Sequence, residues 1–152
     1  MTHGQSPINI LLKNWTIPGA KKARVRPGAE LQSRSMKRAA QLRISEKTEG
    51  QDRILSFQGS ADILSMPAVQ EILSRYSREE IRLLLIDLSE TEFINSPVWA
   101  VITLHARKRR NQSKVVIVGM SERIKGSFEM MGLQTELLTF ADVETARRKL
   151  LE

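Results

Sequence analysis

Apolar residues from residue 40 onward recur with two periods that alternate along the chain, and this alternation restricts the fold more than any other feature. Leu83 to Leu88 is a continuous apolar run broken only by Asp87, which is typical of a strand buried on both faces. Residues 69–76 instead carry apolar side chains at i, i+3, i+4 and i+7, the spacing of one helical face. Because such switches continue to the end of the chain, we expect strand–helix–strand units and a mainly parallel sheet.

The predicted element order is β-β-α-β-α-β-α-β-α. Residues 41–58 predict a hairpin, which adds one antiparallel strand and makes the sheet mixed. Ser65 is expected to cap a helix with Pro67 in its first turn, and Ser96 to cap the next, with Pro97 at its first position. The other predicted elements are a strand over 114–118, a helix from Ser121 to Gly132, a strand over 135–140 and a helix after Asp142. The sequence therefore predicts an α/β domain with a mixed, mainly parallel sheet packed with about four helices.

Charge and composition separate the first part of the chain from the rest. The 152 residues hold 24 Lys and Arg against 17 Asp and Glu, a net charge of +7. Residues 1–35 hold six basic and one acidic residue, or +5, and residues 36–152 hold 18 and 16, or +2. Three prolines and three glycines interrupt the first segment, so we expect a basic, disordered tail over 1–39 and a folded domain over 40–152. Met36 is a second candidate start of translation, with an ordinary internal methionine as the alternative.

Composition argues against several classes of function. The chain has no cysteine and only two histidines, His3 and His105, which excludes a disulfide framework and disfavours a zinc site. Ser96 and His105 would lie about 13 Å apart along one helix, too far for a nucleophile and its base. No apolar run approaches the roughly 20 residues of a membrane helix, and no signal-peptide pattern opens the chain. We therefore expect a cytoplasmic, non-enzymatic protein with no catalytic residues, metal or cofactor.

Segment 87–99 follows the strongest predicted strand and leads into a helix. In open α/β sheets, partners and ligands are met at the ends of the parallel strands and at the helix N-termini that follow. Asp87, Glu90 and Glu92 in this segment, together with Asp62 after the preceding strand, could bring carboxylates together. Ordinary polarity at strand ends explains these four residues better.

The chain resembles the STAS domain family, the fold shared by sulfate-transporter tails and bacterial anti-sigma factor antagonists. The resemblance covers about residues 40–152, and the order and spacing of its segments match the element order above. Those segments are Gly59–Asp62, Leu85–Ser89, Phe93–Ser96, Val115–Gly119 and Phe128–Leu133. The resemblance implies a STAS-type mixed sheet and a partner-binding loop at residues 95–98.

The resemblance aligns Asn95, Ser96 and Pro97 with the Asp-Ser-Ser loop of the antagonist branch, and Val98 with the glycine after it. In that branch a kinase that is also the anti-sigma factor phosphorylates the second serine, and the added negative charge breaks the complex. Proline has no hydroxyl, so the usual switch cannot operate at Pro97. Ser96 is a candidate substitute phosphoacceptor, with capping of the helix as the favoured alternative.

Trp99 follows this loop, and a helical wheel places it with Thr103 on a polar flank, away from the apolar stripe that begins at Val98. Because Trp is enriched at interface hot spots, Trp99 is either an exposed anchor or is packed against a neighbouring helix. His105 lies near the inner stripe and is expected to be structural. The predicted partner-binding residues are Ser60, Asp62, Asn95, Ser96, Pro97, Val98 and Trp99.

The resemblance implies a non-enzymatic protein–protein interaction module in bacterial signalling. Its expected partner is an anti-sigma factor or a related kinase-like protein. One alternative is a STAS subunit or regulator of a membrane transport complex, and another is nucleic-acid binding through the basic runs 21–26 and 107–110. No aromatic residue interleaves with these basic residues, which weakens a single-strand stacking site. The sequence leaves the identity of the partner, any small ligand and the oligomeric state undetermined.

Overall fold

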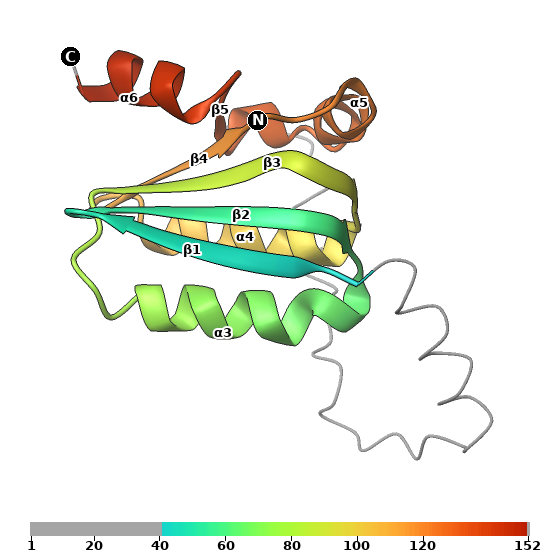
Figure 1. Ribbon diagram of the computed structural model, residues 1–152, viewed down its shortest axis with the longest axis horizontal. Coiled ribbons are helices and arrows are strands. Elements are labelled where there is room, and N and C mark those ends of the chain that lie inside the picture. Colours follow the sequence, from blue (N-terminus) through green and yellow to red (C-terminus); the bar gives the residue numbers. More distant parts are fainter. Residues whose placement is uncertain (1–40, 152) are drawn as a thin grey trace, which may run out of the picture.

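A computed structural model describes residues 41–151, and the tail predicted over 1–39 lies outside these residues. The described part contains a five-stranded sheet in the order β1-β2-β3-β4-β5 (Figure 1). The first strand is antiparallel to the second, and the others are parallel to their neighbours. The strands are β1 (Arg43–Glu49), β2 (Asp52–Ala61), β3 (Leu83–Ile94), β4 (Lys114–Val118) and β5 (Leu138–Phe140). The predicted hairpin and the mixed, mainly parallel sheet are confirmed.

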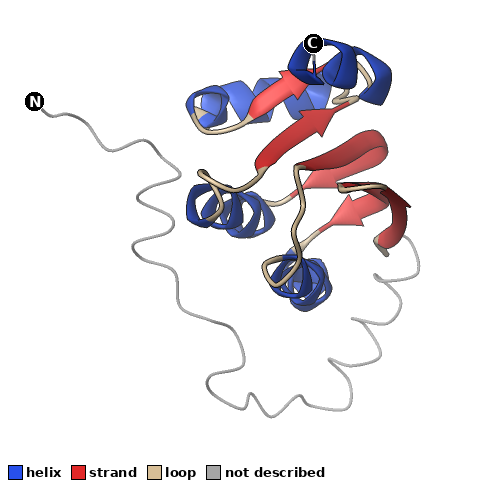
Figure 2. Ribbon diagram, turned by 90° about the vertical axis from the view of Figure 1, so that its left-hand side faces the viewer, coloured by secondary structure: helices blue, strands red, loops and turns tan. Residues whose placement is uncertain are grey.

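Four α-helices and two short 3₁₀ turns connect the strands in the described part of the chain. Figures 1 and 2 show helices on both sides of the sheet, with α3 beneath the strands, α4 behind them and α6 above them in the first view. The helices are α3 (Met66–Tyr76), α4 (Ser96–Lys108), α5 (Glu122–Met130) and α6 (Val143–Leu151), and the turns are η1 (Ile63–Ser65) and η2 (Leu133–Thr135). The predicted order of strands and helices is therefore confirmed.

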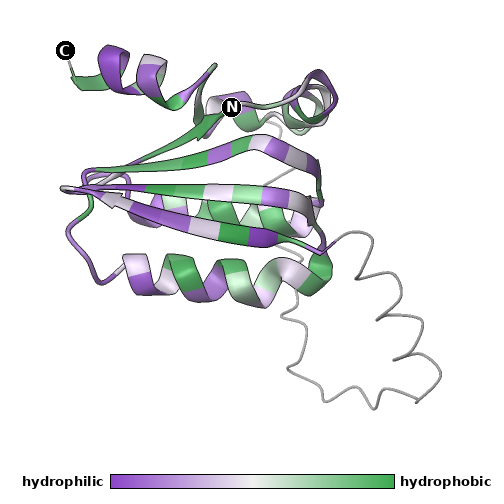
Figure 3. Cartoon of the chain, viewed as in Figure 1, coloured by the Kyte–Doolittle hydropathy of each residue, from purple (hydrophilic) through white to green (hydrophobic). Residues whose placement is uncertain are grey.

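Two apolar cores lie on the two faces of the sheet, because alternate residues of a strand point to opposite sides. The larger core joins Phe57, Leu84 and Ile117 to α3, α4 and α5. The smaller core joins Leu83, Leu85 and Val116 to Ala146 of α6. Figure 3 shows the apolar colouring concentrated in the central strands, whereas β1 is mainly polar. Residues 83–88 of β3 and most of β4 are thus buried on both faces, as their continuous apolar runs predict, whereas β5 at the edge of the sheet is largely exposed.

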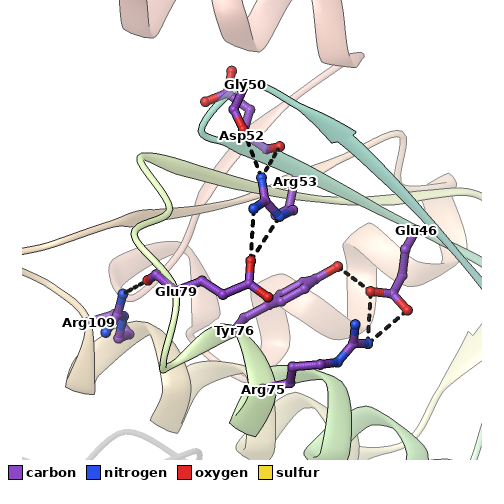
Figure 4. Close-up of polar contacts among 8 residues, drawn as sticks. All are labelled: Glu46, Gly50, Asp52, Arg53, Arg75, Tyr76, Glu79 and Arg109. Atoms are coloured by element: carbon purple, nitrogen blue, oxygen red, sulfur yellow. Dashed lines mark hydrogen bonds and ion pairs between the residues drawn. The ribbon is translucent and has the colours of Figure 1, made fainter.

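Ion pairs and hydrogen bonds fix the hairpin against α3. Figure 4 shows the Tyr76 hydroxyl and the Arg75 guanidinium converging on the Glu46 carboxylate of β1, at 2.7 and 2.8 Å. These two donors hold the pKa of Glu46 below its usual range, the Arg75 contact contributing most. Arg53 of β2 donates to the Glu79 carboxylate at 2.8 Å. The hairpin is therefore anchored both to the end of α3 and to the loop that follows it.

The third strand differs from the sequence prediction, because it continues to Ile94 and does not end near Leu88. The fourth strand stops at Val118, opposite Asp87, so the last part of β3 pairs with β2 alone. Two register shifts, of the kind that β-bulges produce, interrupt this pairing. The predicted strand over 135–140 is also shorter, since the 3₁₀ turn η2 takes its first part.

Candidate functional site

Two connections meet at the edge of the sheet where β2 and β3 end, and we call this edge the carboxyl edge. The first runs from β2 through Asp62 into η1, and the second runs from β3 through Asn95 into α4. The amide of Asn95 donates to the carbonyl of Ala61 at 2.8 Å. This bond brings the two predicted binding segments side by side, at the position where α/β folds meet ligands and partners.

Asp62 organises the first connection by capping η1. Its Oδ1 accepts hydrogen bonds from the amides of Leu64 and Ser65, at 2.9 and 3.2 Å, and from the Ser65 hydroxyl. Ser65 occupies the N-cap position of α3, as predicted, but its side chain makes no capping hydrogen bond to that helix. Ser60 lies almost completely buried beside this turn. Of the two residues predicted here to bind a partner, Ser60 and Asp62, Asp62 is therefore the one whose side chain is half-exposed.

Asn95, and not Ser96, is the N-cap of α4. Asn95 has an extended backbone, and its Oδ1 accepts from the amide of Ser96 at 3.0 Å. The predicted capping role of Ser96 is therefore wrong: Ser96 is the first helical residue, and its Oγ contacts the sulfur of Met131, at 3.9 Å. Asparagine caps helices as well as serine does. Ser96 is half-exposed, and its hydroxyl is directed at a side chain and not at the backbone.

Val98 and Trp99, both predicted to bind a partner, are completely buried. Trp99 packs edge-on against Phe128 of α5, with ring centroids 5.3 Å apart and an interplanar angle of 64°. Trp99 is therefore not an exposed anchor on a polar flank. The alternative, packing against a neighbouring helix, is confirmed. The helical wheel failed because α5 covers the flank that the sequence alone leaves open. Neither side chain can reach a partner without rearrangement of α4.

Three exposed apolar side chains at the carboxyl edge escaped the sequence analysis. Ile63 and Leu64 of η1 are 45% and 52% exposed, and Phe93 near the end of β3 is 43% exposed. Leu64 borders a hollow of about 200 Å³, which Asp62 also lines. Phe93 borders a second hollow of about 160 Å³, between β3 and α5. The two hollows have no lining residue in common. Only their position after Asp62 and before Asn95 signals these three residues in the sequence.

Two of the four residues in the basic run at the end of α4 bind other parts of the domain. Arg107 forms an ion pair with Glu136, which holds the pKa of that carboxyl below its usual range. Arg109 donates to the carbonyls of Ser77 and Glu79, both at 2.8 Å. The other basic run, over residues 21–26, lies outside the described residues. Within residues 41–151, no three His, Cys, Asp or Glu residues could together hold a metal ion. In the same range, no helix is long and apolar enough to cross a membrane.

The element order, the mixed sheet and the two connections at its carboxyl edge define a small α/β domain of ββαβαβαβα topology. The STAS domain family profile matches residues 43–146, and the chain belongs to the STAS domain family. Similarity to curated proteins supports the same assignment. The anti-sigma-B factor antagonist of Listeria monocytogenes is 32% identical over 87 residues, which make up 57% of this chain and 75% of that protein. The Listeria innocua protein of the same name matches equally well.

Solved structures share this fold at low sequence identity. An anti-sigma factor antagonist from Mycobacterium paratuberculosis superposes with a TM-score of 0.68 at 16% identity, covering 73% of this chain and 95% of that one. The unphosphorylated anti-sigma factor antagonist SpoIIAA gives a TM-score of 0.60 at 11% identity, with coverage of 70% and 96%. At such identities the likeness establishes the fold alone.

Proposed function

We propose that this chain is a non-enzymatic STAS interaction module of the anti-sigma factor antagonist type, acting in the bacterial cytoplasm. Its partner would be an anti-sigma factor or a related kinase-like protein. The observation that carries this proposal is the carboxyl edge, where an exposed turn and the start of α4 lie side by side in a chain whose curated relatives are anti-sigma-B factor antagonists.

The proposed contact surface consists of the exposed residues of the two connections. Leu64 and Phe93 supply exposed apolar side chains, and Asp62, Ser96 and Pro97 are partly exposed. Val98 and Trp99 contribute indirectly, because their packing fixes where α4 begins. Protein interfaces combine apolar contacts with polar ones in this way.

Substitution of Leu64 by Asp tests this surface. We expect Leu64→Asp to weaken binding to the cognate anti-sigma factor by roughly tenfold or more, because a charge would replace an apolar contact. Leu138→Asp is the matched control, since Leu138 is similarly exposed but lies on β5. Calorimetry with purified proteins measures both affinities. Equal affinities of wild type and Leu64→Asp would reject this surface.

We also propose that the complex lacks a phosphorylation switch at position 97, since proline offers no hydroxyl. Incubation with the cognate kinase and ATP should leave the wild-type loop unmodified, whereas Pro97→Ser should accept phosphate and lose affinity through the added negative charge. Mass spectrometry locates the phosphate. Phosphate on Ser96 of the wild type would contradict the unswitched proposal and would assign the switch to the neighbouring hydroxyl.

A further inference from the structure

A hollow of about 300 Å³ lies at the end of the sheet opposite the carboxyl edge, and we call it the amino-edge hollow. Three separate parts of the chain line it: Arg82 and Leu83 where β3 begins, residues 110–114 between α4 and β4, and the last two residues of α6. Phe93 lies near the other end of β3, about 33 Å away along the strand. The amino-edge hollow is therefore separate from the proposed partner surface.

The charged side chains that line this hollow are all cations. Arg110 and Lys114 are exposed and make no ion pair within residues 41–151. Asp52 binds Nε and Nη2 of Arg82, at 3.1 and 3.0 Å, which leaves Nη1 of Arg82 without a partner in this part of the chain. Three cationic groups therefore have donors available to a bound anion.

The carboxylates nearest to this hollow lie in the two hollows beside it. Glu136 lines the one next to β4 and pairs with Arg107. Glu79 and Glu80 line the other, where Glu79 pairs with Arg53 and Glu80 is exposed. The carboxyl ends of α4 and α6 also oppose an anion, but by about half a charge each and only within the last turn. The excess of positive charge is therefore local, and it acts on a group bound inside the hollow more than on a distant one.

Ser113 adds a buried polar group to the same wall. It is 8% exposed, and it lines both the amino-edge hollow and the hollow next to β4. Its amide donates to the carbonyl of Arg109, whereas its hydroxyl has no hydrogen-bond partner among the described residues. A buried hydroxyl without a partner is costly, and an oxyanion in the hollow would supply the missing acceptor.

Apolar side chains form the remaining wall. Leu150 packs against the smaller core and Leu151 is 44% exposed, and both line the hollow together with Leu83. Small-molecule sites typically combine such an apolar wall with a few convergent polar groups. A bare inorganic ion would leave this wall uncovered, so the ligand that fits has an apolar part beside its charged group.

We propose that the amino-edge hollow binds a phosphate monoester with a small apolar body. Arg110, Lys114, Nη1 of Arg82 and the Ser113 hydroxyl hold the phosphate, and the two leucines of α6 contact the body. Four donors suit the three terminal oxygens of a phosphate better than the two oxygens of a carboxylate. This site does not rest on the proposed function, because it uses no residue of the partner surface.

Titration of the full chain with phenyl phosphate, followed through its amide NMR signals, tests the site. We expect saturable shifts at Ser113, Lys114 and Leu150, with the signals of Leu64 and Phe93 unchanged. Inorganic phosphate lacks the apolar body and benzoate lacks the third oxygen, so each should bind at least about tenfold more weakly. Shifts that do not saturate, or that centre on the carboxyl edge, would overturn the proposal. Benzoate or inorganic phosphate binding as tightly as phenyl phosphate would overturn the assigned ligand class.

A pair of double variants separates this site from general attraction to positive charge. Arg110→Ala with Lys114→Ala should weaken the binding of phenyl phosphate by about tenfold or more, because charge-assisted hydrogen bonds are lost. The matched control, Arg43→Ala with Lys125→Ala, removes one exposed arginine of β1 and one exposed lysine of α5. It should keep the affinity within about twofold, since distant exposed charges are screened. An equal loss in both double variants would reject the site.

Two single substitutions complete the test. Ser113→Ala should weaken binding by roughly threefold to tenfold through loss of one hydrogen bond, and an unchanged affinity would overturn the role of Ser113. Glu152 follows Leu151 in the sequence and lies outside the described residues. Glu152→Gln should leave the affinity within about twofold, whereas binding that is tighter by about tenfold would mean that the chain's own carboxylate fills the hollow. That result would overturn the proposal.

Discussion

Two buried threonine hydroxyls in this domain have opposite hydrogen-bonding situations. Thr91 Oγ1 donates to the carbonyl of Phe57 at 2.7 Å. Thr103 Oγ1 is fully buried in α4 and has no partner among the described residues. A buried polar group without a partner costs about 1–3 kcal/mol, whereas a satisfied one contributes about 1 kcal/mol. We therefore expect Thr103→Val to stabilise the domain by about 1 kcal/mol and Thr91→Val to destabilise it by a similar amount.

Urea unfolding of the two variants measures this difference in the free energy of unfolding. The substitutions are the same in shape and chemistry, so they serve as controls for each other. Destabilisation by both variants would show that Thr103 has a partner, such as a bound water molecule, that the protein side chains do not supply.

His105 gives the domain a pH-dependent stability. Burial, with the nearby charges of Arg109 and Lys108, lowers its pKa from 6.5 to about 4. Between these values the unfolded chain binds a proton that the folded domain does not, so stability falls as the pH drops from 6.5 to 4. The side chain is partly exposed, so solvent screening reduces the effect to about 1–2 kcal/mol. Thermal melts of wild type and His105→Gln across this range should show a weaker pH dependence in the variant.

At the level of strands and helices, two glycines have opposite effects on the backbone. Gly59 has a φ of +96°, and a Cβ atom there would meet the Gln41 carbonyl. Gly126 lies within α5, where a Cβ atom would have no other atom within 4 Å and φ is not unusual. We expect Gly59→Ala to lower the free energy of unfolding by about 2 kcal/mol or more, and Gly126→Ala to raise it by about 0.5–1 kcal/mol through helix propensity. Chemical denaturation of both variants checks the opposite signs, and a neutral Gly59→Ala would contradict the close passage of the chain.

The sequence predicted elements well where periodicity or capping is local. The hairpin, the Ser121 cap and the left-handed Gly132 all depend on neighbouring residues, and all are present. The path of β3 could not be predicted, because its continuation past Leu88 depends on pairing with β2 across about 30 residues of chain. The burial of Trp99 depends on α5 in the same way.

For the same reason, the sequence predicted where the candidate site lies in the fold, but not which of its side chains are exposed. The connections after β2 and β3 were identified because a chain that alternates strands and helices must place them at one edge. Which side chains face solvent there depends on tertiary packing, and this is why Val98 was included and Phe93 was missed. The helix cap is Asn95 and not Ser96, which is a difference of one residue. Sequence patterns do not locate helix ends to within one residue.

On the scale of the whole molecule, charged side chains of both signs surround the two ends of the sheet. At the carboxyl edge Glu92 and Arg123 line one hollow, and at the opposite edge Arg78 and Glu80 line another. Mixed charges of this kind give no strong single-sign field at either end, so they favour local ion pairs with a partner over long-range attraction.

Asp52 joins three separate parts of the molecule and gives the last prediction. Its buried carboxylate accepts from Arg82 at 3.0 and 3.1 Å and lies 3.6 Å from Arg147 of α6. It thus connects the start of β2, the loop before β3 and the helix on the opposite face. We expect Asp52→Ala to destabilise the domain by about 3 kcal/mol, because it leaves two guanidinium groups without this carboxylate.

Lys47→Ala is the matched control for Asp52→Ala. The ion pair of Lys47 with Glu49 lies in the same hairpin, but Lys47 is 69% exposed, and exposed pairs contribute less than about 1 kcal/mol. Denaturant unfolding, followed by circular dichroism, compares the two variants. Amide hydrogen exchange should in addition show lost protection in α6 for Asp52→Ala alone, since α6 contacts the rest of the domain through the small core and through Arg147. Equal protection of α6 in both variants would mean that the small apolar core holds this helix without the ion pairs.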